Sequence, residues 1–334
     1  MVFSSLFFLY VFLPLCLICY AAFKKLKYRN MVLIVFSLIF YAWGEPLCVF
    51  LLIFSTMVNY LLALLIRKYR GGRGAKIAVT TAVVFDLAML GVFKYSGFIA
   101  ENLNVILPFD IPVPDIMLPI GISFYTFQII SYMVDCHWEK VKVQKSFYKF
   151  LMYVSLFPQL VAGPIVRYST IEAEINERHT TITDVAEGIS RFSVGLAKKV
   201  LIANNLSTVV DSFFKGNISE LSVVGTWFAV IAYAMQIYFD FSGYSDMAIG
   251  LGRIFGFHFD ENFKYPFICK DVSEFWQRWH ISLGSFFRDY LLYIPIFGKR
   301  RKYGGLFLVW FCTGLCHGAS WNYIIWGLYF GAFI

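Results

Sequence analysis

A set of ionisable side chains gathers in the last third of a chain that is otherwise mostly apolar. Ionisable groups inside membrane segments cost several kcal/mol each, so such a set is by default a candidate functional site. The side chains fall in three motifs, at residues 238–246, 275–290 and 314–321. The candidate site residues are Asp240, Asp246, Arg278, His280, Arg288, Asp289 and His317.

His317 is the candidate best suited to proton transfer. It follows a run of almost wholly apolar residues, 306–316, and Gly314 and Gly318 flank it, so backbone or substrate can approach closely. Burial among apolar groups favours the neutral imidazole, which accepts a proton near neutral pH. This pattern predicts a buried general base. The alternative is a structural histidine that is hydrogen-bonded between helices.

The second histidine motif predicts a shared helix face. If residues 275–290 form one helix, Trp276, His280, Gly284 and Arg288 recur every four residues and point the same way. His280 is then either a second catalytic residue or a member of a structural polar network. The remaining histidines lie beside charged or loop residues and are expected at the surface; they are His137, His179 and His258.

Asp240 and Asp246 admit two interpretations. They could be catalytic carboxylates, but they lie six residues apart through Gly243 and need not share a face. Buried charges persist mainly when they are paired. Structural ion pairs with Arg278 or Arg288 are therefore the favoured expectation.

No metal or redox site is predicted from the cysteines. Cys312 and Cys316 lie one helical turn apart, but Cys316 and His317, as neighbours, point about 100° apart on a helix and cannot easily bind one ion. The same geometry disfavours a nucleophile and base pair. Cys16 and Cys19 have CxxC spacing, yet they lie inside an apolar run without a βαβ context.

The composition indicates a polytopic membrane protein. Of 334 residues, 59% are hydrophobic and only 15% are charged, and the mean hydropathy is +0.66. Because a spanning helix needs roughly 20 apolar residues, the length allows about eight to ten crossings. The net charge of +8 comes from short basic loops that set orientation, so nucleic-acid binding is not expected.

The basic loops predict the topology. Lys and Arg cluster at residues 24–29, 67–76 and 140–149, whereas residues 100–117 carry acidic side chains and neither Lys nor Arg. The positive-inside rule then places the N-terminus on the external side of the membrane. The clearest spans are residues 6–23, 47–66, 77–98, 118–134 and 223–239.

Two segments depart from simple spans. Residues 150–166 are apolar but contain Pro158, Gly163 and Pro164, which predicts a re-entrant segment. Residues 172–199 alternate apolar and charged positions, as in a surface amphipathic helix. The chain stops at Ile334 inside an apolar run, so we expect a single transmembrane domain over residues 1–334 that is truncated at its C-terminus.

The motifs together resemble the membrane-bound O-acyltransferase family, in particular its bacterial alginate O-acetyltransferase branch. The similar stretches cover nearly the whole chain; they are residues 1–8, 40–44, 118–128, 157–165, 195–199, 239–246, 278–280 and 317–321. The resemblance implies an all-α polytopic membrane protein, with a ring of tilted helices and re-entrant segments around a central tunnel. Members of the family are longer than this chain, which agrees with a truncated C-terminus.

The resemblance also implies an activity and its residues. The family's active-site histidine falls on His317 and its second recurrent histidine on His280. The implied reaction moves an acetyl group from cytoplasmic acetyl-CoA, with no tightly bound cofactor, towards an extracytoplasmic polysaccharide through a partner protein. Two departures are Cys316, where the family usually has Trp, and a stretch after Tyr290 that is one residue longer than usual.

Other functions remain open at this point. Within the family, the reaction could be D-alanyl transfer to teichoic acid, and the polysaccharide could be alginate, peptidoglycan or another exopolysaccharide. Outside the family, a proton-coupled transporter or flippase could use Asp240 and Asp246. A non-catalytic scaffold within a polysaccharide export complex is the third possibility.

Overall fold

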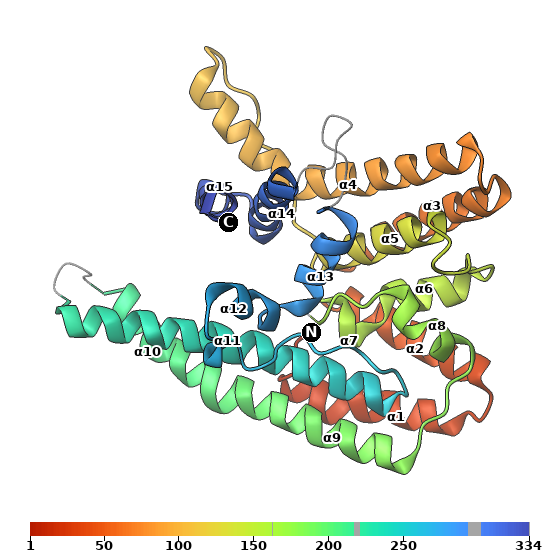
Figure 1. Ribbon diagram of the computed structural model, residues 1–334. Coiled ribbons are helices and arrows are strands. Elements are labelled where there is room, and N and C mark those ends of the chain that lie inside the picture. Colours follow the sequence, from red (N-terminus) through yellow and green to blue (C-terminus); the bar gives the residue numbers. More distant parts are fainter. Residues whose placement is uncertain (162, 217–220, 293–301, 334) are drawn as a thin grey trace. The chain divides into compact units, whose positions relative to one another are not determined.

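The computed structural model describes residues 1–161, 163–216, 221–292 and 302–333, and within these ranges it contains helices and no strand (Figure 1). The backbone divides into two compact units. The first comprises residues 1–43, 156–166 and 170–281, and the second comprises residues 44–155, 167–169 and 282–334. His280, Asp240 and Asp246 belong to the first unit, whereas Arg288, Asp289 and His317 belong to the second.

The α-helices differ widely in length, from the four residues of α7 to the 34 of α4. Those of the first unit are η1 (Phe8–Phe12), α1 (Leu13–Ala22), α2 (Leu26–Ala42), α7 (Phe157–Leu160), most of α8 (Tyr168–Asn176), α9 (Ile182–Ala197), η2 (Lys198–Ala203), α10 (Asn204–Phe214), α11 (Val223–Ile254), η4 (Pro266–Ile268) and α12 (Val272–Arg278). Those of the second unit are α3 (Cys48–Lys68), α4 (Arg73–Ile106), α5 (Ile122–His137), α6 (Phe147–Ser155), most of α13 (Ile281–Tyr290), α14 (Lys302–His317) and α15 (Trp321–Phe333).

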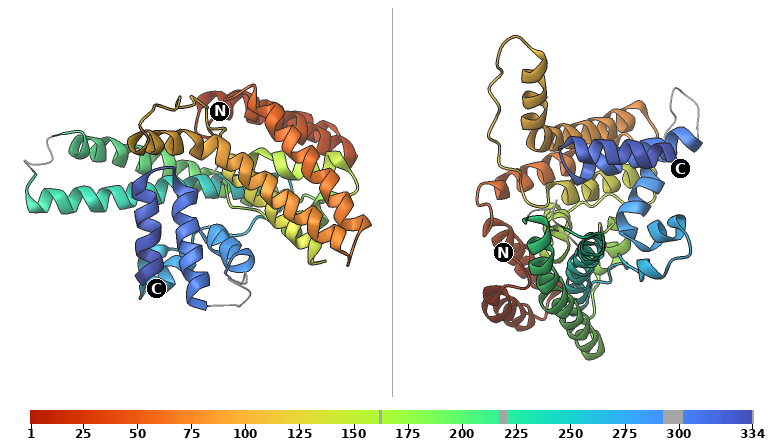
Figure 2. Two further views of the ribbon diagram at one scale, coloured as in Figure 1. Left: turned by 90° about the horizontal axis from the view of Figure 1, so that it is seen from above. Right: turned by 90° about the vertical axis from the view of Figure 1, so that its left-hand side faces the viewer.

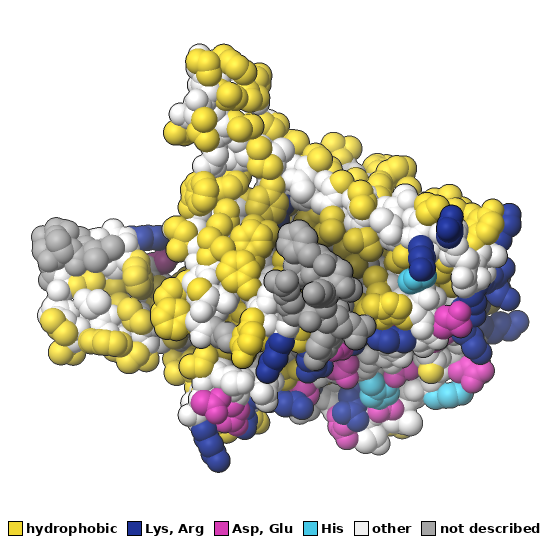
Figure 3. Space-filling view, turned by 45° about the horizontal axis from the view of Figure 1, so that its top comes forward, with side chains coloured by type: hydrophobic (Ala, Val, Ile, Leu, Met, Phe, Trp, Pro, Cys, Tyr) yellow, Lys and Arg dark blue, Asp and Glu magenta, His cyan; other side chains and the backbone are white. Residues whose placement is uncertain are grey.

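Three helices in the described ranges are long and apolar enough to cross a membrane, namely α3, α4 and α11, and Phe8–Ala22 forms a shorter apolar helix. They correspond to the spans predicted at residues 47–66, 77–98 and 223–239. Hydrophobic side chains cover much of the face seen in Figure 3, and large ones such as Phe50 and Val224 are well exposed. The expectation of a multi-pass helical membrane protein is confirmed, while the ring around a tunnel stays a prediction.

The predicted re-entrant segment is broken where its sequence suggests. Helix α6 ends at Ser155, and the four-residue helix α7 begins with Phe157 and Pro158. The backbone N–H of Phe157 donates to the Ser37 hydroxyl over 3.1 Å, which gives the interrupted chain a partner outside its own helix. The phenyl ring of Phe157 packs against the rings of Phe12 and Phe40, at centroid distances of 5.6 and 5.5 Å. The break is thus held by an aromatic core.

Glycine contacts hold the longest helices of the first unit together. Helices α9, η2 and α10 follow one another without interruption and run alongside α11 (Figures 1 and 2). A Cβ atom on Gly195 would lie 2.5 Å from the carbonyl oxygen of Gly243, and one on Gly250 would lie 2.6 Å from that of Gly188. No real Cβ atom fits at such distances, so the two backbones approach as closely as they do only because these positions are glycine.

The predicted amphipathic helix forms, but only part of its apolar stripe is packed. Helix α9 begins at Ile182 with a capping box, in which Thr181 and Asp184 each satisfy the other's backbone N–H. Ile182 and Ile189 are exposed, at 91% and 53%. Its buried residues are Gly188, Phe192 and Gly195; Phe192 belongs to the predicted apolar pattern, whereas the two glycines that meet α11 do not.

The second unit contains an antiparallel helix pair that carries His317. Helices α14 and α15 lie side by side in both views of Figure 2. A Cβ atom on Gly314 would lie 2.4 Å from the carbonyl oxygen of Tyr323, and one on Gly318 would lie 2.3 Å from its ring. The glycines that flank His317 therefore serve the close approach of α15 to α14.

We predict that Gly250→Val destabilises the protein by about 1–3 kcal/mol, because the added methyl groups meet backbone atoms of α9 that cannot move aside. The melting temperature in detergent should fall. Gly91→Ala in α4 is the matched control, since a Cβ atom there meets nothing within 4 Å and alanine favours the helix. Equal melting temperatures for Gly250→Val and wild type would contradict the close packing.

The start of α9 gives the fold an acid-sensitive contact. The pKa of Asp184 is lowered from its usual value near 4, mainly by the Thr181 hydroxyl and also by the Thr181 backbone N–H. A carboxyl whose folded pKa is lowered stabilises the fold above its unfolded pKa, and this contribution is lost as the pH falls through the folded pKa. Asp184→Asn should therefore melt lower than wild type at pH 7, and the difference should shrink below about pH 4. A difference in melting temperature that does not depend on pH would show that the ionised Asp184 carboxylate is not its cause.

Candidate active site

His317 is the last residue of α14, and its ring has a defined tautomer. Nδ1 lies 2.7 Å from the backbone carbonyl oxygen of Thr313, one turn earlier in the same helix. A carbonyl oxygen can only accept, so Nδ1 carries the proton and donates it. Nε2 is then left with its lone pair, as proton acceptance from a substrate hydroxyl requires.

The structure corrects the expectation that His317 is buried, because its side chain is exposed. The preceding apolar run packs along α15, but His317 follows that run at the point where the helix ends. The rings of Trp326 and Tyr323 lie 5.4 and 6.2 Å from the imidazole, centroid to centroid. The ring therefore has aromatic neighbours on one side and remains accessible.

Helix α4 supplies side chains that satisfy the end of α14. The last carbonyl groups of a helix lack partners within it. The Lys94 ammonium donates to the Cys316 carbonyl oxygen, and the Tyr95 hydroxyl donates to that of Leu315. A cation at a helix C-terminus also interacts favourably with the helix dipole. Lys94 and Tyr95 thus hold the residues immediately before His317.

The beginning of α15 is attached to the same helix. The indole Nε1 of Trp321 donates to the Asn102 side-chain oxygen over 2.7 Å, and the Trp321 ring meets that of Phe98 at 5.7 Å. Both ends of the turn that contains His317 are therefore fixed to α4. Lys94 was not among the predicted site residues, although a single lysine inside the apolar run at residues 77–98 was a usable signal.

His280 does not lie within a continuous helix, which corrects the predicted shared face. Helix α12 ends at Arg278 and α13 begins at Ile281, and His280 has a left-handed backbone with φ of 48°. This conformation costs a non-glycine residue about 1–3 kcal/mol and persists where the surroundings impose it. Here the backbone N–H of Ile281 donates to the Asn262 carbonyl oxygen over 2.9 Å. Tertiary contacts therefore override the helical spacing.

The His280 ring is buried among partners of its own unit. Its Nδ1 lies 3.2 Å from the side-chain oxygen of Asn262. The ring of Phe241 meets the imidazole edge-on at 4.7 Å, and that of Phe263 stacks on it at 6.4 Å. Buried and oriented by a side-chain amide, His280 has the environment of either a catalytic or a structural histidine.

Asp240 and Asp246 are ion-paired as expected, but the predicted partners were wrong. Asp240 contacts Lys199 at 2.6 Å, and Asp246 contacts Lys198 and Arg191, also at 2.6 Å. The partners come from α9 and η2 because Gly195 and Gly243 bring those helices against α11.

Arg278 has a local partner. Its guanidinium contacts Glu274, one turn earlier in α12, at 2.6 Å, and donates to the Lys264 carbonyl oxygen over 3.1 Å. The pKa of Glu274 is lowered, mainly by the backbone N–H of Lys270 and then by Arg278. Arg278 therefore ties α12 to the preceding loop.

Arg288 and Asp289 form a network in the second unit. Arg167 contacts Asp289 at 2.8 Å, and Arg288 contacts it at 3.0 Å. The next residue, Tyr290, donates its hydroxyl to Asp135 over 2.7 Å. These contacts fix the end of α13. The longer stretch after Tyr290 lies mostly outside the described residues.

Within the described ranges, no group of three or more His, Cys, Asp or Glu side chains is arranged to hold a metal ion. The cysteines of these ranges are free thiols.

Comparison with known proteins identifies the family. The family model of the membrane-bound O-acyltransferases matches residues 35–334. Over its whole length the chain is 42% identical to the probable alginate O-acetylase AlgI of Azotobacter vinelandii, and it covers 68% of that protein.

Two further relatives show the range of the family. The peptidoglycan O-acetyltransferase of Helicobacter pylori is 34% identical over 99% of this chain, which covers 69% of that protein. The teichoic acid D-alanyltransferase of Bacillus subtilis is 30% identical over 63% of this chain, which covers 56% of that protein. The chain belongs to the membrane-bound O-acyltransferase family and is, as such, an O-acyltransferase.

Proposed function

We propose that the protein transfers an acetyl group from cytoplasmic acetyl-CoA across the membrane towards an extracytoplasmic polysaccharide. The observation that carries this proposal is the exposed His317 ring, whose Nδ1 proton is committed to Thr313 and whose Nε2 is thereby left to act as a base. A partner protein outside the membrane would receive the acetyl group and pass it to the polymer. The N-terminus would lie on that same outer side of a bacterial inner membrane.

The proposed reaction needs one base and no metal. Nε2 of His317 takes the proton of an acceptor hydroxyl as its oxygen attacks the thioester carbonyl carbon. The tetrahedral intermediate then collapses, the carbon–sulfur bond breaks, and the imidazolium returns the proton to the CoA thiolate. The products are an acetyl ester and free CoA, and transfer from thioester to ester is downhill. Throughout, the Nδ1 hydrogen bond to Thr313 holds the ring in place.

The relatives favour an acetyl donor over a D-alanyl donor. The relatives named as acetylases match across essentially the whole chain, whereas the named D-alanyltransferase matches over 63% of it. The acceptor polymer is then alginate, peptidoglycan or a related polysaccharide. The basic loops predicted on the cytoplasmic side suit the phosphates of acetyl-CoA, since Lys and Arg form charge-assisted hydrogen bonds with them.

The transporter alternative has less support. Its proposed proton carriers, Asp240 and Asp246, each form a 2.6 Å contact with a lysine. Contacts this short suit structural ion pairs, because buried charges persist mainly when they are paired.

We predict that His317→Ala lowers acetyl transfer by about 10²–10⁴-fold, the usual contribution of a general base. Release of CoA from labelled acetyl-CoA by the purified protein with its partner measures the effect. His280→Ala in the same assay tests the second histidine. The exposed His179 provides the control, since His179→Ala should retain wild-type activity with the same elution profile. Full activity of folded His317→Ala would refute the assignment.

Lys94 should act as a positioning residue. Lys94→Met removes the donor to the Cys316 carbonyl, so the end of α14 loses a charge-assisted hydrogen bond of about 1.5–3 kcal/mol and kcat should fall. Lys94→Arg retains a cationic donor and should recover part of the rate. A purely structural role would lower the melting temperature and kcat together. An unchanged kcat in Lys94→Met would show that the contact does not matter.

A further inference from the structure

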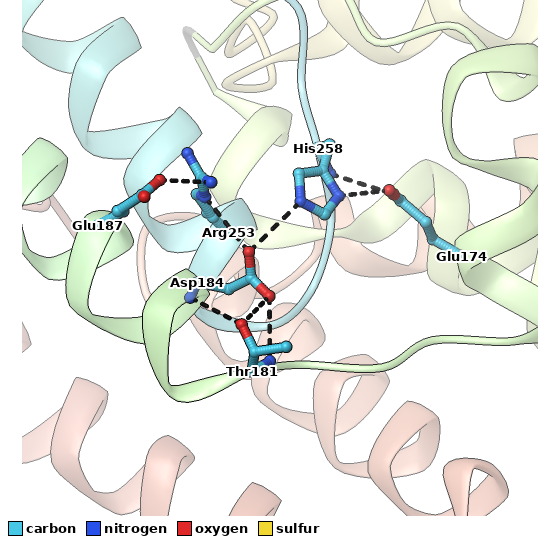
Figure 4. A network of polar contacts seen from close by, with 6 residues as sticks. All are labelled: Glu174, Thr181, Asp184, Glu187, Arg253 and His258. Atoms are coloured by element: carbon cyan, nitrogen blue, oxygen red, sulfur yellow. Dashed lines mark hydrogen bonds and ion pairs between the residues drawn. The ribbon is translucent and has the colours of Figure 1, made fainter.

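A polar cavity of about 370 Å³ lies in the first unit, beside the charged network drawn in Figure 4. It is formed by one face of α9, the last turn of α11 and the loop that follows α11. Its lining includes Glu187, Arg191, Val194, Arg253, His258 and Glu261. The volume falls within the range of about 300–1,000 Å³ that is usual for small-ligand sites. Of the residues described at the candidate active site, only Arg191, the partner of Asp246, lines this cavity.

The cavity wall carries balanced charges. Arg253 pairs with Glu187 and lies 3.6 Å from Asp184. Arg191 pairs with Glu261 at 2.6 Å. A guanidinium has five N–H donors and a carboxylate about four acceptor sites, so these contacts leave capacity on both kinds of group. A purely anionic ligand would face the two glutamates, and a purely cationic one would face the two arginines. The lining fits a ligand that carries one charge of each sign.

Histidine 258 adds a further polar group at the cavity. Its backbone N–H and its ring Nδ1 both contact the Glu174 carboxylate, at 3.1 and 2.6 Å, and Nε2 lies 3.8 Å from Asp184 (Figure 4). Because a carboxylate only accepts, Nδ1 carries a proton. The ring is thus fixed between two acidic residues at the cavity's edge.

The cavity lies at a depth where lipid headgroups are found. Helix α11 has 32 residues, which at 1.5 Å each give about 48 Å, whereas the hydrocarbon core measures about 30 Å and the whole bilayer about 40–45 Å. The large exposed apolar residues of α11 lie between Val223 and Ile237. Arg253, in the last turn, therefore lies beyond the hydrocarbon core. Val194 at the cavity and Ile189 nearby are both about half exposed, which gives acyl chains an apolar surface.

We propose that this cavity binds the phosphoethanolamine headgroup of a membrane phospholipid. The phosphate contacts Arg191 and Arg253, and the primary ammonium contacts Glu187 and Glu261. A quaternary choline group has no N–H to donate to the glutamates, and a glycerol headgroup has no positive charge for them. The site therefore prefers phosphatidylethanolamine to phosphatidylcholine and phosphatidylglycerol. The proposal does not depend on the acetyl-transfer chemistry.

Native mass spectrometry of the detergent-purified full chain tests this lipid preference. Phosphatidylethanolamine, phosphatidylcholine and phosphatidylglycerol with identical acyl chains are titrated separately. Wild type should retain phosphatidylethanolamine about tenfold better than the other two, in line with the loss of one charge-assisted hydrogen bond. Equal retention of the three lipids would overturn the proposal.

Two variants separate specific binding from a general loss of structure. Glu187→Gln with Glu261→Gln removes the two negative charges that attract the ammonium and should shift the preference towards phosphatidylglycerol, an inversion that misfolding does not produce. Arg253→Gln should weaken the binding of both phosphatidylethanolamine and phosphatidylglycerol. Lys215→Gln is the matched control, because Lys215 is exposed and pairs with Asp211 in α10. Unchanged lipid preference in the double variant would contradict the assigned contacts.

Soluble ligands distinguish the source of the headgroup. Glycerophosphoethanolamine has the same charges without acyl chains and should compete only weakly, since it lacks the apolar contacts. Equally tight binding of this compound would show a soluble metabolite site in place of a lipid site. CoA should not displace the lipid. If CoA displaces the lipid equally from wild type and from Lys215→Gln, the cavity belongs to the acyl donor and the proposal is overturned.

Discussion

Within a membrane a polar group finds no water, so each charge and each unpaired backbone group must find its partner inside the protein. In the first unit, Lys198 and Lys199 meet this requirement by pairing with Asp246 and Asp240. In the second unit, Lys94 meets it by donating to a backbone carbonyl at the end of α14. The same requirement therefore produces structural ion pairs in one unit and support for a candidate catalytic residue in the other.

Satisfying the charges of the first unit requires unusually close helices. Lysine and aspartate can meet across two backbones only if those backbones approach, and Gly195 and Gly243 permit this at a contact where a Cβ atom would lie 2.5 Å from a carbonyl oxygen. The hydrophobic effect contributes little to helix association within lipid, so such packing and polar contacts must supply the specificity. The exposure of Ile182 and Ile189 agrees with this, because these apolar residues of α9 face outward while its glycines face α11.

The sequence predicts what depends on local composition. The helical class, three spans and the break near Pro158 follow from apolar length and from proline, and the structure confirms them. The partners of Asp240 and Asp246 could not be predicted, since they depend on how closely α9 approaches α11. The prediction of a continuous helix through His280 was wrong for a related reason. A spacing of four residues fits a helix, but the N–H of Ile281 donates to the Asn262 carbonyl oxygen and the helix breaks at His280.

The exposure of His317 shows how a motif can identify a residue while misleading about its surroundings. An apolar run suggests burial for every residue in it, but His317 follows the run, and a helix end differs from a helix interior. In the proposed reaction the base must meet both a hydroxyl and a thioester, so each substrate needs a path to the same nitrogen. What such a base requires is orientation. Thr313 fixes its tautomer, and Lys94 and Tyr95 fix the backbone that carries it, so an accessible ring can still be a precisely oriented one.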